Sequence, residues 1–202
     1  NLPDRPTPDL QEVVVGSANG ELVAELNMKD LRKRLDYVSA DGKRYGASLA
    51  DLLLDTDLDP NTGGAPLSLW RMDTKPAHFG YEFRIAVLAG FRIQSADGSG
   101  SKVGDISLDN ANYVKIEPII KFQVYSLGSQ RFGSKHIELS EADSERLDSE
   151  LALLDNDHVK LRIPYNYLGI KSEGKIRVAY LDVQEGGTAE SSVSSDQTLT
   201  LK

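Results

Sequence analysis

Residues 47–64 read ASLADLLLDTDLDPNTGG, an apolar run that leads directly into an acidic turn. The leucine-rich part, residues 47–54, predicts a buried β-strand, although a short helix of Ala and Leu fits the same residues. The Asp, Asn, Pro and Gly residues that follow are typical of turns, because each satisfies a particular backbone conformation or hydrogen bond. We therefore expect a strand and turn unit here.

The sequence on both sides of this unit alternates apolar and polar residues, as strands do. Residues 11–17 and 21–28 flank turn residues that end in Asn19-Gly20, and they predict a hairpin. The clearest alternation covers residues 81–93, with a bulge or bend expected at Gly90 and a bulge or edge at Pro118. Further strands are predicted at residues 111–117, 119–127, 158–164, 175–183 and 197–201.

Two segments favour helix. Residues 30–35 predict a single helical turn, and residues 140–143 (SEAD) resemble a capping box. Leu147, Leu151 and Leu154 then give the following segment one apolar stripe. The pattern predicts an all-β fold, an antiparallel β-sandwich that is jelly-roll-like or immunoglobulin-like, with one short packed helix. Residues 1–10 are interpreted as a linker or processed N-terminus and residues 11–202 as a single domain.

Composition limits the function. The chain has 202 residues, of which 40% are apolar, enough for one packed core. A net charge of -8 argues against a general nucleic-acid binder and favours cation binding. No apolar run reaches the roughly 20 residues of a transmembrane helix, and the absence of cysteine excludes thiol catalysis, thiolate zinc sites and disulfides.

The Pro-rich start, NLPDRPTP, resembles a linker left after a removed leader, so we expect a secreted, periplasmic or cell-surface protein. A trimmed cytosolic fragment is the alternative. Nucleophile elbows, phosphate loops and dinucleotide fingerprints are all missing from the sequence, and His78, His136 and His158 are too far apart for a zinc helix. We therefore do not expect an enzyme.

The acidic turn is the candidate metal site. Asp55, Asp57, Asp59 and Asn61 place oxygen-bearing side chains at alternate positions, and Ca²⁺ binds oxygen ligands of this kind. The alternative is a loop in which the Asp side chains only cap backbone amides.

The loop is not an EF-hand, because Pro60 stands where glycine is required and Pro66 where a bidentate Glu is required. A carboxylate remote in sequence, such as Glu82 or Asp182, is a candidate to complete the shell.

Three motifs in this order resemble the family-nine carbohydrate-binding modules and the wider DOMON-like superfamily. They are Asp-Thr-Asp at residues 55–57, Gly-Tyr-Glu at residues 80–82 and Ile-Pro-x-x-x-Leu-Gly at residues 163–169. The resemblance implies a β-sandwich that binds sugars, that binds haem in a subset of members, or that serves as an accessory domain of an exported protein.

Sugar-binding relatives clamp the ligand between aromatic rings. This chain has one tryptophan, Trp70, so a clamp of two Trp rings is absent. Candidates for the second ring are Tyr125, Tyr165, Tyr167 and Tyr180, since an aromatic face stacks on a pyranose.

Glu82 and Arg84 are two residues apart on one strand face and are candidates to bond sugar hydroxyls, with a solvated ion pair as the alternative. Lys121, Lys160, Arg162, Lys175 and Arg177 would form a basic sheet surface if their faces align, or else an ordinary soluble face.

We predict a non-catalytic extracellular binding module, for carbohydrate or a related ligand, with Trp70, Glu82, Arg84 and Tyr125 at the site and calcium in the acidic turn. One alternative is a structural or protein-interaction domain of a larger exported assembly. Another is a haem-binding domain, for which Met72, close to Lys75 and His78, is the candidate axial ligand; haem is not our expectation.

Overall fold

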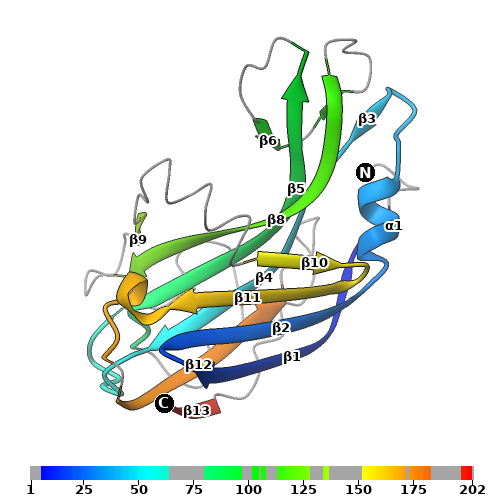
Figure 1. The fold of residues 1–202 in the computed structure, drawn as a ribbon. Helices are drawn as coiled ribbons and strands as arrows, with labels where there is room; N and C mark the ends of the chain where they lie inside the picture. The colour runs from blue at the N-terminus through cyan, green and yellow to red at the C-terminus, as the bar shows by residue number, and fades with distance from the viewer. Residues whose placement is uncertain are drawn as a thin grey trace.

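The computed structural model describes residues 6–63, 80–96, 102–104, 106–107, 113–127, 134–136, 152–171, 173–182 and 197–201. Its strands form two antiparallel sheets that lie face to face, the smaller one in front of the larger one in Figure 1. The predicted all-β sandwich is confirmed. In the described part of the chain, no helix is long and apolar enough to span a membrane.

The smaller sheet has four strands in the order β1-β2-β11-β10. Their bounds are β1 Asp9–Ala18, β2 Glu21–Lys29, β10 Ala152–Asp155 and β11 His158–Pro164. The predicted β1–β2 hairpin is present. Asn19 and Gly20 have φ of 54° and 77°, the pair of left-handed residues that a two-residue hairpin turn favours.

The larger sheet has the order β13-β12-β4-β5-β8-β9, and β6 pairs with β5 beside this path. Its strands are β4 Ala47–Asp55, β5 Phe83–Ser95, β6 Lys102–Gly104, β8 Tyr113–Leu127, β9 Ser134–His136, β12 Gly174–Asp182 and β13 Gln197–Leu201. The leucine-rich run at residues 47–54 is therefore strand and not helix. A separate ribbon pairs β3 Lys43–Arg44 with β7 Ile106–Ser107.

The core lies between the sheets, because each strand turns every second side chain inward. Leu52 and Leu54 of β4, Ile85 of β5, and Leu22 and Leu26 of β2 are completely buried there. Each such side chain contributes about 1.5–3 kcal/mol by leaving water. This hydrophobic contact between the sheets fixes which strand residues remain on the outer faces.

The helical prediction is confirmed at one place, and at the other it is contradicted at Leu154. Residues 30–35 predict a helical turn, and α1 Leu31–Asp36 is found. Residues 137–151 lie outside the described residues, but Leu154, the last member of the predicted helical stripe, belongs to strand β10. Asn156, with φ 53°, and Asp157 form a tight turn that pairs Asp155 with His158, so this segment joins the smaller sheet.

Of the features predicted at Gly90 and Pro118, neither bulge is present, whereas the edge position predicted as the alternative for Pro118 is found. Gly90 pairs with Ile119 and Phe91 with Pro118 without a register shift, and β8 is one strand of 15 residues. Among the described residues, β8 has a neighbour on its other side only at Tyr125–Leu127, where β9 pairs. Within the described part of the chain Pro118 therefore lies on an edge, the position in a sheet where proline is tolerated.

Candidate metal centre

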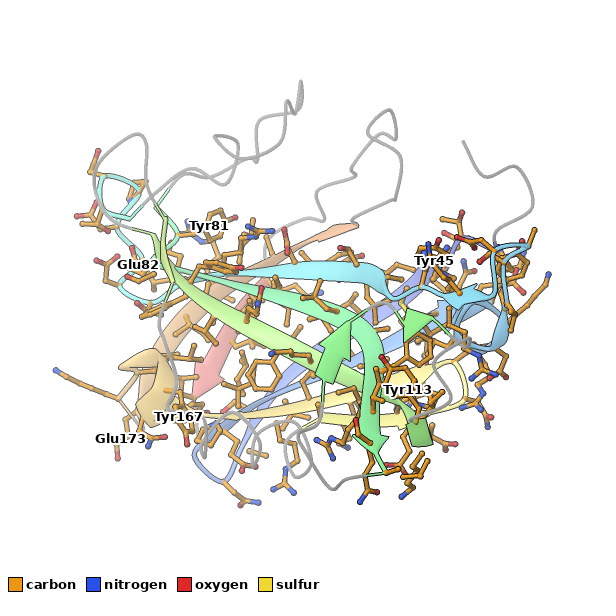
Figure 2. All side chains as sticks on the ribbon, turned by 90° about the horizontal axis from the view of Figure 1, so that it is seen from above. Tyr45, Tyr81, Glu82, Tyr113, Tyr167 and Glu173 are labelled. Atoms are coloured by element: carbon orange, nitrogen blue, oxygen red, sulfur yellow. The ribbon has the colours of Figure 1, made fainter. Side chains whose placement is uncertain are left out.

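The acidic turn is held against the start of strand β5. Because β4 and β5 are antiparallel neighbours with Leu54 opposite Phe83, the chain after Asp55 meets the chain before Phe83. The Glu82 N–H donates to the Leu54 carbonyl at 2.8 Å. Figure 2 shows Tyr81 and Glu82 at this end of the molecule, far from Tyr45 and Tyr113 at the other end. Strand pairing thus brings Glu82 to a loop more than twenty residues earlier in the sequence.

Asp55, Asp57 and Glu82 form a group that can hold a metal ion. One carboxylate oxygen from each lies within 4.8 Å of the other two. Asp55 is buried, Glu82 is half-buried and Asp57 is exposed, so the group is open to solvent at Asp57. We call these three residues the acidic triad.

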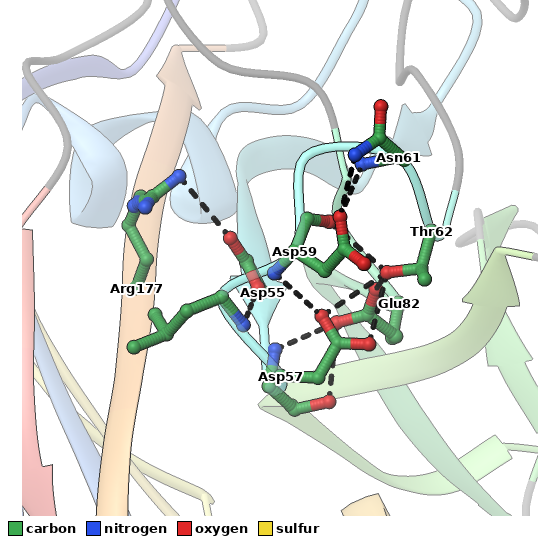
Figure 3. Close-up of polar contacts among 9 residues, drawn as sticks. Asp55, Asp57, Asp59, Asn61, Thr62, Glu82 and Arg177 are labelled. Carbon is green, nitrogen blue, oxygen red and sulfur yellow. Dashed lines mark hydrogen bonds and ion pairs between the residues drawn. The ribbon is translucent and has the colours of Figure 1, made fainter.

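The hydroxyl of Thr62 lies among oxygens that all need a positive partner (Figure 3). Its Oγ1 is 3.0 and 2.9 Å from the two Asp57 carboxylate oxygens, 3.0 Å from the Asp59 carbonyl and 3.1 Å from Glu82 Oε1. A hydroxyl has a single proton and can donate to only one acceptor at a time. The remaining oxygens crowd together with too few hydrogens between them, which is the environment that a cation relieves.

The second carboxylate oxygen of Glu82, Oε2, is hydrogen-bonded to the loop. Glu82 Oε2 accepts the Thr56 N–H at 2.6 Å and the Thr56 hydroxyl at 3.1 Å. Burial is the main reason that the pKa of Glu82 is raised, and the negative charge of Asp57 adds to it, while the hydrogen bonds from Thr56 and Thr62 act in the opposite direction. The carboxylate is therefore short of positive charge in spite of its donors.

Asp55 ends strand β4 and is almost completely buried. Its Oδ1 accepts the Leu58 N–H at 2.6 Å, and its Oδ2 lies 3.2 Å from Nη1 of Arg177 on β12, the residue opposite Asp55 in the sheet. Burial raises the pKa of Asp55 first of all, and the charge of Asp57 raises it further, against the opposing effects of Leu58 and Arg177.

Two glycines let the loop approach β5 this closely. At Gly63, with φ +63°, an added Cβ would lie 2.4 Å from the Tyr81 carbonyl oxygen, and at Gly80, with φ +108°, 2.5 Å from the Asp59 carbonyl oxygen. Leu58 also has a left-handed φ of 61°, which is uncommon for a residue with a branched side chain. The backbone of this loop is therefore closely constrained.

The other predicted metal ligands have a different role in the described structure. Asp59 Oδ1 accepts both the backbone N–H and the side-chain amide of Asn61, each at 2.9 Å. The Asp59 carboxylate is not part of the acidic triad, although the Asp59 carbonyl faces Thr62. Glu82, which the sequence offered as one of two possible remote ligands, is the one brought to the site. The feature of the sequence that pointed to Glu82 was the Gly-Tyr-Glu motif at the start of the strand that pairs with β4.

The predicted ligand-binding residues are only partly brought together. Arg84 Nε donates to Asp51 Oδ2 at 2.8 Å, and both side chains are largely buried. The Arg84 guanidinium also lies 5.2 Å from the centre of the Tyr125 ring, and Tyr125 is opposite Arg84 in the sheet. The Tyr125 hydroxyl donates to Gln123 at 2.7 Å. Trp70 lies outside the described residues.

Glu82 belongs to the acidic loop rather than to this group, although it is two residues from Arg84. Tyr165 is a core residue whose hydroxyl contacts that of Ser17, and Tyr167 and Tyr180 pack against the same core. Of the four tyrosines that were candidates for a second ring, Tyr125 is the one beside Arg84.

The candidate basic residues do not share one face. Lys160 and Arg162 lie on the smaller sheet, where they pair with Glu25 at 2.5 Å and Glu21 at 2.6 Å. Lys121 and Arg177 are in the larger sheet. Met72, Lys75 and His78, the haem candidates, lie outside the described residues.

No protein-family model, curated protein or solved structure matches this chain. The resemblance to family-nine carbohydrate-binding modules and DOMON-like proteins therefore stays a prediction from the sequence motifs.

Proposed function

We propose that this chain is a non-catalytic binding domain of an exported protein, and that a bound Ca²⁺ orders its acidic loop. The observation that supports this best is the cluster around the Thr62 hydroxyl. Four oxygens of Asp57, Asp59 and Glu82 surround this hydroxyl, which has a single proton to donate. A hydroxyl, a carbonyl and carboxylates are the oxygen ligands that Ca²⁺ takes in proteins.

The donor set favours calcium over other ions. Carboxylates of Asp55, Asp57 and Glu82 would hold the ion, with Thr62 and the Asp59 carbonyl next to them and water on the exposed side. Ca²⁺ accepts six to eight oxygens in flexible geometry, whereas Mg²⁺ demands a near-ideal octahedron. Zn²⁺ prefers sulfur and imidazole ligands, and the acidic triad contains neither.

The role of such an ion is structural. Its ligands come from the loop after β4 and from Glu82 just before β5, so the ion would fasten these two segments together. Glu82 is followed two residues later by Arg84, the candidate ligand-binding residue, so an ordered loop also fixes the beginning of that strand.

Carbohydrate is the ligand class that the residues around Arg84 support. The Tyr125 ring offers a face for a sugar, while Arg84 and Gln123 are hydrogen-bonding groups beside it. The ion pair with Asp51 holds the Arg84 guanidinium in place, which reduces the entropy lost when a ligand binds.

The calcium proposal is tested by thermal unfolding of chelator-treated protein. We expect added Ca²⁺ to raise the melting temperature, since a ligand that binds only the folded state at 100 times its Kd stabilises it by about 2.7 kcal/mol. Glu82→Gln should remove most of the increase, while the exposed Glu173→Gln should keep it. A wild-type melting temperature that Ca²⁺ does not change would refute the proposal.

The carbohydrate proposal is tested by calorimetry with oligosaccharides of several classes. Tyr125→Ala should lose the affinity that the wild-type protein shows, because the ring face is removed, whereas Tyr113→Ala at the other end of the molecule should bind normally. Failure of the wild-type protein to bind any class would leave a structural or protein-interaction domain as the better description.

A further inference from the structure

Arg177 is the one described cationic side chain that forms an ion pair with the acidic triad. It reaches the triad from β12, where the sheet register places it directly opposite Asp55 (Figure 3). Asp57 and Glu82 have no such partner among the described residues. The position of Arg177 therefore determines how much positive charge the triad has in the absence of a metal ion.

The contact between Arg177 and Asp55 is close but weakly directed. Nη1 and Oδ2 are 3.2 Å apart and both atoms are buried, yet neither makes a hydrogen bond in the described structure. Arg162 offers a contrast, because its Nε and Nη2 both donate to Glu21, at 2.9 and 2.6 Å, on the other sheet. A buried ion pair that contributes to stability usually has good hydrogen-bond geometry. The Arg177 pair lacks it.

We propose that Arg177 is a built-in counter-ion, which neutralises Asp55 in the metal-free protein and competes with a divalent cation for that carboxylate. The inference rests on the proposed cation site. An isolated buried carboxylate is costly, so Arg177 allows the loop to fold before an ion binds. When an ion binds, the same guanidinium stands as a positive charge next to it and repels it.

The consequence is that Arg177 lowers the affinity of the acidic triad for a divalent cation. Two positive charges compete for the Asp55 carboxylate, and the loose geometry of the arginine contact makes it the one that gives way. The site would then respond to cation concentration instead of holding the ion permanently.

The test is calorimetric titration of Ca²⁺ into chelator-treated wild-type protein, Arg177→Gln and Arg162→Gln. Both variants remove one positive charge, but Arg162 lies on the opposite sheet and pairs with Glu21. We expect Arg177→Gln to bind Ca²⁺ about tenfold more tightly than the wild-type protein, because a nearby repulsive charge is lost. Arg162→Gln should bind Ca²⁺ within about twofold of the wild-type affinity, since Arg162 is an exposed residue of the other sheet and salt screens the effect of its charge on the triad.

Equal or weaker binding by Arg177→Gln overturns the inference but leaves the cation site standing. Absence of Ca²⁺ binding in the wild-type protein and in both variants overturns the proposed site, and this inference with it.

A measurement on the wild-type protein covers the case in which Arg177→Gln does not fold. The Nε–H resonances of Arg177 and Arg162, assigned by NMR, are followed during the Ca²⁺ titration. If the ion displaces Arg177 from Asp55, the Arg177 signal shifts and exchanges faster with water, while the Arg162 signal stays unchanged. An Arg177 signal that does not respond at saturating Ca²⁺ contradicts the inference.

Discussion

Single residues decide whether the acidic loop can form. The loop approaches β5 so closely that two positions have no room for a side chain, and both have backbone angles that favour glycine. This is a local requirement of the site and is independent of whether an ion is bound. It also explains why Gly63, near the end of the turn, is more than a generic turn signal.

Substitution at Gly63 tests this requirement. Gly63→Ala places a Cβ 2.4 Å from the Tyr81 carbonyl oxygen at φ +63°, so both a steric clash and backbone strain are expected. We predict a loss of about 2–4 kcal/mol in the free energy of unfolding, measured by urea denaturation.

Two other glycines provide matched controls for Gly63→Ala. Gly20 has φ +77° but open space around its Cβ position, so Gly20→Ala should cost only the backbone strain, about 1–2 kcal/mol. Gly16 has neither constraint, and Gly16→Ala should be within about 0.5 kcal/mol of the wild-type protein. Equal costs for Gly63→Ala and Gly20→Ala would show that the close approach to Tyr81 does not matter.

At the scale of elements, strand β4 links the two candidate sites. Its outward-facing residues Asp51 and Asp55 pair with Arg84 of β5 and Arg177 of β12, on either side of the buried Leu53. Both ion pairs therefore lie on the face of the larger sheet that is turned away from the core. Burial raises the pKa of Asp51, while the charge and hydrogen bond of Arg84 lower it. The buried Asp51 carboxylate therefore depends on Arg84 as its partner.

The pair Asp51–Arg84 gives the second prediction. Arg84→Met leaves a buried carboxylate without its counter-ion, and we expect a loss of about 3–5 kcal/mol in the free energy of unfolding. The double variant Arg84→Met, Asp51→Leu replaces the pair with apolar groups and should recover most of that loss. Chemical denaturation of the single and double variants measures both values. A double variant as unstable as Arg84→Met alone would show that the arginine acts mainly through its contact with Tyr125.

The elements differ in how far the sequence could predict them. Alternation and the Asn19-Gly20 turn indicated the β1–β2 hairpin, because both signals act between neighbouring residues. The residues that surround Asp55 could not be predicted in the same way. Glu82 and Arg177 reach it through the register of β5 and β12 against β4, which depends on pairing between distant segments. Leu154 was assigned to a helix because its spacing fits a helical stripe, but the turn at Asn156 and its pairing with β11 outweigh that local signal.

At the scale of the whole molecule, the balance of charges makes stability depend on pH in an unusual direction. Burial raises the pKa of three carboxylic acids, Asp51, Asp55 and Glu82, above their ordinary values. Between the ordinary and the raised pKa, the folded protein binds more protons than the unfolded chain. These groups therefore add stability as the pH falls toward 3.8 for Asp and 4.5 for Glu, and they reduce it as the pH rises through the raised values.

Asp41 works in the opposite direction and over a different range. Hydrogen bonds from Ser39 and Lys43 are the main reason that its pKa is lowered to about 2. Its contribution to stability is complete above the ordinary pKa of 3.8 and is lost as the pH falls toward 2. The contribution of Asp41 is thus lost only below pH 3.8, where the stabilising effect of the three buried groups is already complete.

We predict that the chelator-treated protein is more stable at about pH 5 than at pH 7.5, and that saturating Ca²⁺ reverses this order. As the pH falls from 7.5, protons neutralise Asp55 and Glu82 earlier than they would in the unfolded chain, because burial raises the pKa of both. At pH 7.5 Arg177 is the one cationic partner of the charged triad among the described residues until an ion binds. Since the ion and the protons compete for the same carboxylates, Ca²⁺ should stabilise the protein most at the higher pH. Melting temperatures at the two pH values, with and without Ca²⁺, measure the effect. In Asp55→Asn the dependence on Ca²⁺ should be largely lost, and a wild-type protein that Ca²⁺ stabilises equally at both pH values would show that the buried carboxylates do not hold the ion.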